Sequence, residues 1–144
     1  MRFKTKAVEH EFQAQLEPAA AAIALYSDWY AVQKFGKDLM VTDVSRDQAE
    51  YDRIYAQKIA EGVYFIGDDG TKHYSGPRPH LADPHAGTTS RAVDFRTIGE
   101  LTHGKILELK SHLNSEFRRR DGKQTAIYHD VGAGAHLHVQ AEAV

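Results

Sequence analysis

The chain contains no cysteine. This absence excludes disulfide bonds, zinc sites built from thiolates and catalysis by a cysteine nucleophile. The chain also lacks a strong charge of one sign, because its formal net charge is −2 and its pI is about 6.5. Such a balance provides no electrostatic attraction to nucleic acid or to an anionic membrane. We therefore expect a protein that binds neither of these partners.

Long apolar runs are absent as well. The longest, residues 19–26, is far shorter than the roughly 20 residues that a membrane-spanning helix needs. Glu17 and Pro18 precede this run and no small-residue cleavage site follows it, so it does not have the form of a secretory signal peptide. We expect a protein that is cytoplasmic as synthesised. The length of 144 residues predicts a single domain, 1–144, and we expect a monomer.

Hydrophobic periodicity and capping residues predict three helices. Pro18 suits the first turn of a helix that ends at Gly36. The Ser-x-x-Gln pattern at 45–48 and the Thr-x-x-Glu pattern at 97–100 have the form of capping boxes. The predicted helices therefore cover residues 18–35, 45–60 and 97–119.

Short apolar segments between these helices predict strands over residues 38–44, 62–66, 91–96, 125–129 and 135–140. Residues 1–15 are expected to form a poorly defined segment or the start of a helix. Residues 71–90 are rich in proline and glycine, and we expect an irregular loop there, of a length that often carries function. The order of elements suggests an α+β fold in which helices back a small antiparallel sheet.

The chain has nine histidines, and two of them alternate with apolar residues in the strand predicted at 135–140. Side chains alternate between the faces of a strand, so His136 and His138 project from one face. Asp94 stands between two apolar residues of another predicted strand. Imidazole and carboxylate are good zinc ligands, and a catalytic zinc uses three protein ligands and a water. These residues indicate a zinc site; the alternative is two partly exposed histidines and a solvated acid without a metal.

Three stretches of sequence carry a resemblance to a known family. They are Val-Thr-Asp-Val-Ser-Arg at 41–46, Pro-His at 84–85 with Arg-Ala-Val-Asp-Phe-Arg at 91–96, and His-Leu-His-Val-Gln at 136–140. Together they resemble the zinc D-Ala-D-Ala metallopeptidases and related LAS enzymes (lysostaphin-like, D-alanyl peptidase and sonic-hedgehog-like), among which phage endolysins are common. The resemblance spans residues 39–140, which is nearly the whole chain.

The resemblance implies a hedgehog/DD-peptidase-like fold and a zinc ion bound by His85, Asp94 and His138. It implies that His136 is the catalytic histidine beside the metal. It also implies that Arg46 pairs with a carboxylate of the substrate, a role that suits the planar fork of arginine. The implied substrate is a peptidoglycan stem peptide, hydrolysed at a D-alanine or L-Ala-D-Glu-type link. Reaching the cell wall would require another protein, such as a holin.

Two departures from the family pattern leave alternatives open. Eight residues separate His85 from Asp94, which is more than the family usually has, so His80 is an alternative first ligand. Many members also carry a carboxylate base three residues before the last zinc histidine, and here this position is Ala135. Proton transfer would then fall to His136 or, alternatively, to His129 or Asp130.

We therefore expect a zinc-dependent peptidase of peptidoglycan, in the manner of a carboxypeptidase or endolysin. One alternative is a non-catalytic structural or binding module of the same fold, for instance in a virion, which the long His85 to Asp94 spacing favours. Another is a hydrolase of this fold that acts on an amide outside the cell wall. Arg46, His136 and Gln140 favour an enzyme, because a structural site needs neither an open coordination position nor an arginine that faces a substrate.

Overall fold

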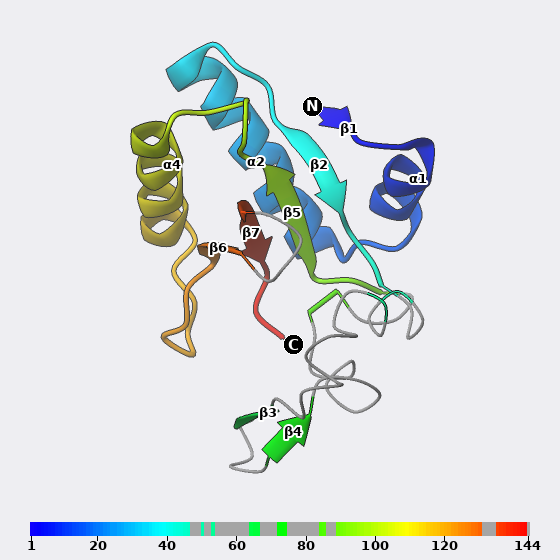
Figure 1. The fold of residues 1–144 in the computed structure, drawn as a ribbon. Helices are drawn as coiled ribbons and strands as arrows, with labels where there is room; N and C mark the ends of the chain where they lie inside the picture. Colours follow the sequence, from blue (N-terminus) through cyan, green and yellow to red (C-terminus); the bar gives the residue numbers. More distant parts are fainter. Residues whose placement is uncertain are drawn as a thin grey trace.

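The structure of the protein is a computed structural model that describes residues 1–46, 50, 53, 64–66, 72–74, 84–85, 89–130 and 135–143. Within these ranges a sheet runs in the strand order β1-β2-β5-β7-β6, and β3 pairs with β4 as a separate hairpin (Figure 1). The elements in chain order are β1 (Arg2–Phe3), α1 (Lys6–Ala14), α2 (Pro18–Phe35), β2 (Met40–Asp43), β3 (Tyr64–Ile66), β4 (Lys72–Tyr74), β5 (Ala92–Arg96), α4 (His103–Glu116), β6 (Ala126–Asp130) and β7 (Ala135–Gln140).

Helix α2 confirms the prediction for residues 18–35. Pro18 occupies the first turn, where its missing N–H has no helical partner in any case. Gly36 ends the helix in the left-handed conformation, with φ of 67°, and its N–H donates to the carbonyl of Val32 at 2.9 Å. Glycine has no Cβ, so it adopts this backbone conformation without strain.

The sheet is mixed, and the prediction of an antiparallel sheet is wrong at one edge. Strand β1 pairs with β2 in parallel, whereas the pairs β2–β5, β5–β7 and β7–β6 are antiparallel. Backbone bonds from the Arg2 N–H to the Leu39 carbonyl (2.8 Å) and from the Lys4 N–H to the Val41 carbonyl (2.9 Å) secure β1. Helix α1 follows, and the Thr5 hydroxyl caps it by accepting from the Val8 N–H.

The helix predicted at 97–119 is shorter, and its predicted capping box is wrong. Helix α4 begins at His103, and the cap is Thr102, whose hydroxyl accepts from the Lys105 N–H. Thr97 instead directs its hydroxyl to the Ala135 carbonyl on β7 at 3.1 Å. Gly99 lies between the two threonines with φ of 73°, which is incompatible with a helix starting at residue 97.

Few of the predictions for the central part of the chain can be compared with the structure. The helix predicted at 45–60 lies almost entirely outside the described residues, and so does His80. The strand predicted at 62–66 is present as β3, Tyr64–Ile66. Strand β4 lies inside the loop predicted at 71–90 and pairs with β3 in antiparallel register, so part of that segment is regular.

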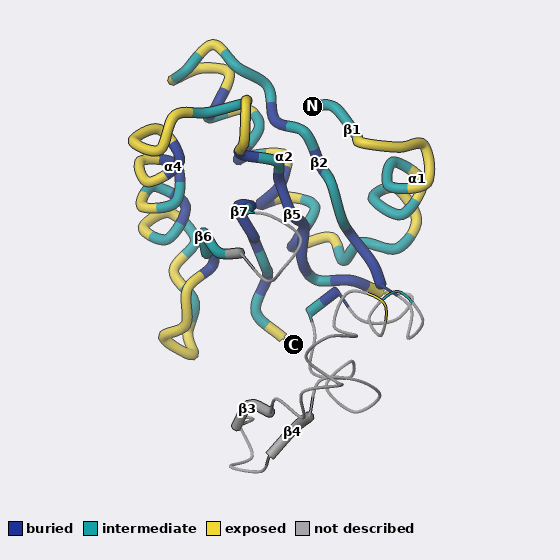
Figure 2. The backbone as a smooth tube through the Cα atoms, in the orientation of Figure 1, coloured by how far each residue is buried: buried dark blue, intermediate teal, exposed yellow. Residues whose placement is uncertain are grey.

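Helices α2 and α4 cover one face of the five-stranded sheet, and the core lies between them (Figures 1 and 2). Apolar side chains of β2, β5 and β7 pack there against both helices. This core comprises Val41, Val93, Phe95, Leu137 and Val139 of the sheet with Ala20, Ile23, Ala24, Ala31, Leu109 and Leu113 of the helices. The polar residues that alternate with them on β5 and β7 therefore lie on the opposite face. Among the described helices, none has the length and apolar character needed to cross a bilayer.

Candidate metal centre

Strand register brings the predicted site residues together on the face opposite the helices. Asp94 on β5 lies opposite His138 on β7, and His136 lies opposite both Arg96 on β5 and His129 on β6. These five residues share one face because side chains alternate along each strand. The sequence pattern therefore predicted the shared face correctly, and sheet pairing supplied the neighbours.

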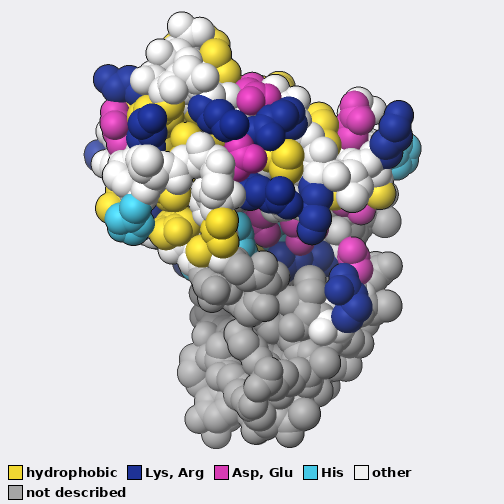
Figure 3. All heavy atoms as spheres, turned by 45° about the horizontal axis from the view of Figure 1, so that its top comes forward, with side chains coloured by type: hydrophobic (Ala, Val, Ile, Leu, Met, Phe, Trp, Pro, Cys, Tyr) yellow, Lys and Arg dark blue, Asp and Glu magenta, His cyan; other side chains and the backbone are white. Residues whose placement is uncertain are grey.

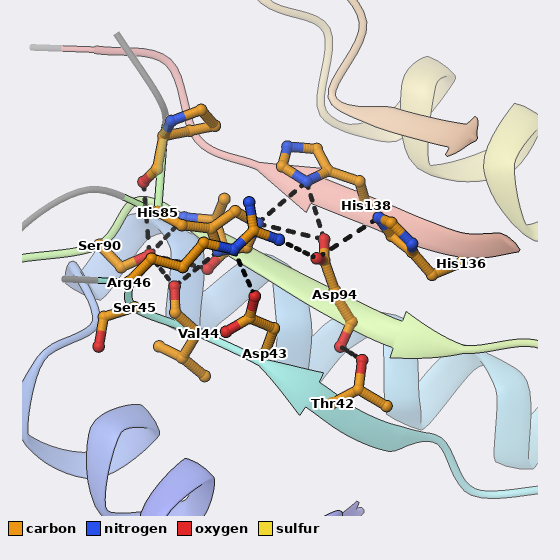
Figure 4. Close-up of polar contacts among 12 residues, drawn as sticks. Thr42, Asp43, Val44, Ser45, Arg46, His85, Ser90, Asp94, His136 and His138 are labelled. Atoms are coloured by element: carbon orange, nitrogen blue, oxygen red, sulfur yellow. Dashed lines mark hydrogen bonds and ion pairs between the residues drawn. The ribbon is translucent and has the colours of Figure 1, made fainter. Parts of the chain in front are cut away.

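His85, Asp94 and His138 form a buried cluster whose ligand atoms converge (Figure 4). The His85 Nε2 atom lies 3.2 Å from Asp94 Oδ1 and 3.2 Å from His138 Nδ1. The His138 Nδ1 atom lies 2.8 Å from the same carboxylate oxygen. Two nitrogens and one oxygen thus form a small triangle.

Hydrogen bonds on the far side of each imidazole determine which nitrogen faces this triangle. The His85 Nδ1–H group donates to the Val44 carbonyl at 2.6 Å, so its Nε2 is the nitrogen that faces the triangle. The His138 Nε2–H group donates to the Gln140 side-chain oxygen at 2.9 Å, so its Nδ1 is the nitrogen that faces the triangle. Partners of this kind orient histidine ligands toward metals.

The triangle has the composition and size of a metal site. In these tautomers all three atoms are lone-pair acceptors, and they repel one another unless a cation or a proton lies among them. Zinc binds nitrogen and oxygen at about 2.0–2.1 Å, which corresponds to ligand separations of about 3.3 Å in a tetrahedron. The observed separations of 2.8–3.2 Å are close to this value. The residues present therefore fit a divalent metal ion.

The segment that carries His85 is fixed to the sheet by backbone bonds. The His85 carbonyl accepts from the Arg46 N–H at 2.8 Å, and the Pro84 carbonyl accepts from the Arg91 N–H at 3.0 Å. The Ser90 hydroxyl donates to the Val44 carbonyl at 2.6 Å. These contacts place His85 in the cluster despite its long separation from Asp94 in sequence. His85 thus contributes a nitrogen to the cluster, and the alternative first ligand, His80, lies outside the described residues.

Charge in the cluster shifts the titration of its members. Burial opposes protonation of His85, but the Asp94 carboxylate outweighs it and raises the pKa of His85 to about 9. Burial also favours the neutral form of Asp94, but His85 and His138 hold the pKa of this carboxyl well below its usual range. Asp94 is therefore ionised at neutral pH, which suits a metal ligand.

Two further histidines flank the cluster. The His136 Nε2 atom lies 3.4 Å from Asp94 Oδ2, the carboxylate oxygen that the triangle does not use. The His129 ring is 4.7 Å from the His136 ring and 5.4 Å from the His138 ring, measured between centroids. Burial, together with the neighbouring imidazoles of His138 and His136, lowers the pKa of His129 to about 4. His129 is consequently neutral at pH 7.

Arg46 joins the cluster from the loop after β2 (Figure 4). A register shift between Val41 and Asp43 places Asp43 opposite Asp94. The Arg46 guanidinium bridges the two carboxylates, with Nε 2.6 Å from Asp43 Oδ2 and Nη2 3.3 Å from Asp94 Oδ2. Its side chain is only 7% exposed. The resemblance implied an arginine that meets the substrate, and the structure shows that Arg46 neutralises protein carboxylates.

A pocket of about 450 Å³ opens beside the cluster. Its wall includes Asp94, His136 and Arg46, and it extends over α1 and β5 to Lys4 and Arg96. Sequence reasoning missed Asp43, Val44 and Arg96 as members of the site. Only Arg96 had a usable signal, because it follows Asp94 at the two-residue spacing of a strand face.

The described geometry thus contains a buried group of two imidazoles and one carboxylate that could hold a metal ion, next to a polar pocket. No protein-family model, curated protein or solved structure matches this chain.

Proposed function

We propose that this protein is a metal-dependent hydrolase of amide bonds, with zinc as its metal and peptidoglycan stem peptides as its substrate. The observation that carries the proposal is the convergence of three acceptor atoms from His85, Asp94 and His138 at the edge of a pocket. The substrate class and a hedgehog/DD-peptidase-like fold come from the resemblance of the three sequence stretches, and the α+β architecture is compatible with both.

The number of protein ligands favours catalysis over a structural role. Structural zinc sites in proteins almost always have four protein ligands, whereas catalytic sites have three and keep one position for water or substrate. Only three ligand atoms converge among the described residues, and Asp94 also faces the pocket. A substrate carbonyl in the pocket would therefore have access to the remaining position.

The side chains around the cluster suit amide hydrolysis. A zinc ion held there would supply a hydroxide nucleophile at neutral pH and polarise the scissile carbonyl. His136 lines the pocket, and its Nε2 would accept the proton of the attacking water and return it to the leaving amine. His129 is a poor proton acceptor at pH 7 because its pKa is about 4. Arg46 would keep Asp94 ionised and oriented.

Substitution of single histidines tests this division of roles. His138→Ala and Asp94→Ala are expected to lose zinc and hydrolysis of a purified muropeptide together, whereas His136→Ala is expected to keep zinc and lose at least about 100-fold in kcat. His10→Ala, an exposed histidine on α1, is the matched control. Full hydrolysis by His136→Ala would contradict the assignment of proton transfer.

A non-catalytic module of the same fold is the second candidate function. This candidate is favoured by the ion pairs of Arg46 with Asp43 and Asp94. Because of these pairs, the guanidinium that the resemblance assigns to the substrate already contacts protein carboxylates. For such a module we expect one tightly held zinc per chain, retained in a chelator-resistant form, and no hydrolysis of any muropeptide by the wild-type protein.

A further inference from the structure

Among the residues that the structure describes, the lining of the pocket beside the metal centre carries more cationic than acidic side chains. Among the described residues, its lining contains four cationic and three acidic side chains, namely Lys4, Arg46, Arg53 and Arg96 with Asp43, Glu50 and Asp94. Arg46 bridges Asp43 and Asp94, so these three form one group. Within the described lining this leaves the three cations Lys4, Arg53 and Arg96 and the one carboxylate of Glu50. Figure 3 shows Lys and Arg side chains gathered around a few acidic ones on one face of the molecule.

Of Lys4, Arg53 and Arg96, only Arg96 is carried by β5, the strand that also carries Asp94. It follows Asp94 by two residues on β5, so both side chains leave the same face about 6.8 Å apart. It also lies opposite His136 on β7. Its side chain is half-buried and forms neither an ion pair nor a hydrogen bond within the described ranges. Burying part of a guanidinium without a partner is unfavourable, and a bound anion would remove this cost.

We infer that Arg96 binds the C-terminal carboxylate of the peptide substrate, with Lys4 at the pocket rim adding to the attraction. This inference rests on the proposed function and deepens it, because a substrate whose free carboxylate lies next to the scissile amide is a substrate for a carboxypeptidase. The planar fork of arginine holds a carboxylate through two parallel hydrogen bonds, which fixes the orientation of the peptide as well as its charge.

The distances available on the sheet agree with a carboxylate close to the scissile bond. An extended peptide advances by about 3.4 Å per residue. A carbonyl at the remaining position of the metal centre would therefore place the carboxylate of the next one or two residues level with Arg96. A peptide that continued for many residues beyond the scissile amide would instead carry its carboxylate out of the pocket.

Arg46 is less suited to this task than Arg96. Its guanidinium already contacts two carboxylates at 2.6 and 3.3 Å, and its side chain is 7% exposed. A substrate carboxylate at Arg46 would have to displace Asp43 or approach Asp94 directly, and like charges repel. We therefore assign anion binding to Arg96 and the neutralisation of Asp43 and Asp94 to Arg46.

Binding of two matched probes tests the inference. N-acetyl-D-alanyl-D-alanine and its C-terminal amide differ only in the charge of the last group, and their affinities for the purified full chain can be measured by calorimetry. The acid is expected to bind at least about 10-fold more tightly than the amide to the wild type. Arg96→Gln is expected to weaken binding of the acid by about 10- to 100-fold and to leave the affinity for the amide unchanged.

Arg118→Gln is the control, because it removes the same charge at an exposed position outside the pocket. Arg96→Lys keeps the charge without the fork and is expected to restore part of the affinity. Equal binding of acid and amide by the wild type, no binding of the acid, or an unchanged acid affinity in Arg96→Gln would overturn the inference. Inorganic phosphate that binds as tightly as the acid would also overturn it, because the pocket would then select charge alone.

The same experiment separates this inference from the proposed function. Hydrolysis is followed in parallel by release of D-alanine from the acid probe. Discrimination by Arg96 without hydrolysis would support the anion site and count against the proposed reaction. Hydrolysis of acid and amide at equal rates, unaffected by Arg96→Gln, would support the reaction and overturn the anion site.

Discussion

At the scale of single residues, the candidate metal site depends on groups that lie outside the triangle of ligand atoms. The Val44 carbonyl and the Gln140 side chain each hold one imidazole nitrogen as a donor, and thereby turn the other nitrogen of His85 and of His138 into the cluster. A histidine with the wrong tautomer would present an N–H to a cation. Outer partners of this kind are worth about 10- to 100-fold in metal affinity.

Gln140→Leu is therefore expected to weaken zinc binding by about 10- to 100-fold while the fold is kept, because His138 loses the acceptor that orients it. The measurement is a competition titration against a zinc chelator. Gln140→Glu retains an acceptor and is expected to retain affinity. Gln124→Leu, an exposed glutamine outside the site, controls for the loss of an amide. Wild-type affinity in Gln140→Leu would show that the tautomer of His138 is set by other groups.

The polar residues of the cluster were largely predictable from sequence, and their partners were not. Period-two alternation placed Asp94, His136 and His138 on one face, since the apolar residues between them must face the core. The resemblance selected His85, whose position then depends on backbone bonds from Arg46 and Arg91 that no sequence pattern contains. The bridging role of Arg46 also follows from the register shift in β2, which sequence alone does not show.

At the scale of elements, the short strand β1 is held to the rest of the fold by side-chain ion pairs as well as by backbone hydrogen bonds. The Arg2 guanidinium donates to Glu100 at 2.7 Å and to Asp38 at 3.0 Å, and Lys37 lies 3.1 Å from Glu100. These contacts connect β1, the end of α2 and the turn that precedes α4. Glu100 is 11% exposed, so its charge is only partly screened by water.

Hydrogen bonds from Arg2 and then Lys37 lower the pKa of Glu100 to about 2, below its value in the unfolded chain. Glu100 therefore stabilises the fold above the unfolded pKa of about 4.3, and this contribution is lost as the pH falls from there toward 2. Glu100→Gln is expected to lower the free energy of unfolding by about 1–2 kcal/mol at pH 7, because Arg2 and Lys37 are partly exposed, and by much less at pH 3.

Urea denaturation of both proteins at pH 7 and pH 3 measures this difference. Glu108→Gln removes the same charge from an exposed pair with Lys34 at 3.8 Å and is expected to change stability by less than about 0.5 kcal/mol. A Glu100→Gln deficit that stays constant between the two pH values would show that the carboxylate charge is not its source.

Helix α2 and strand β7 were predictable, whereas strand β1 and the start of helix α4 were not. Pro18 and Gly36 bound α2, and the alternating pattern bounds β7 at 135–140. Strand β1 has two residues, too few for any period, and it depends on pairing with β2. The error at Thr97 has a similar cause, because its hydroxyl bonds to β7, a partner distant in sequence, instead of capping the helix.

At the scale of the whole molecule, a metal ion would tie together three parts of the chain. His85 comes from the segment before β5, Asp94 from β5 and His138 from β7. Without a cation, three acceptors would face one another in a buried space, or a proton would be held there by His85. Folding and metal binding are therefore expected to be coupled.

Zinc at 1,000 times its dissociation constant is expected to stabilise the wild-type fold by about 4 kcal/mol, which corresponds to a rise of roughly 10 °C in the unfolding midpoint. Calorimetric scans with zinc and with a chelator measure this rise. His136→Ala is expected to show the same rise and Asp94→Ala none. An unfolding midpoint of the wild type that is the same with zinc and with chelator would show that folding is not coupled to metal binding.

The metal content of the purified chain decides whether His85, Asp94 and His138 bind a metal ion. Elemental analysis of the wild type, of His136→Ala and of Asp94→Ala, each expressed with zinc available, counts the ions held per chain. We expect about one zinc in the wild type and in His136→Ala, and none in Asp94→Ala, since a catalytic site holds one ion through three protein ligands. A wild-type chain without metal, or an Asp94→Ala chain that keeps its zinc, would contradict this expectation.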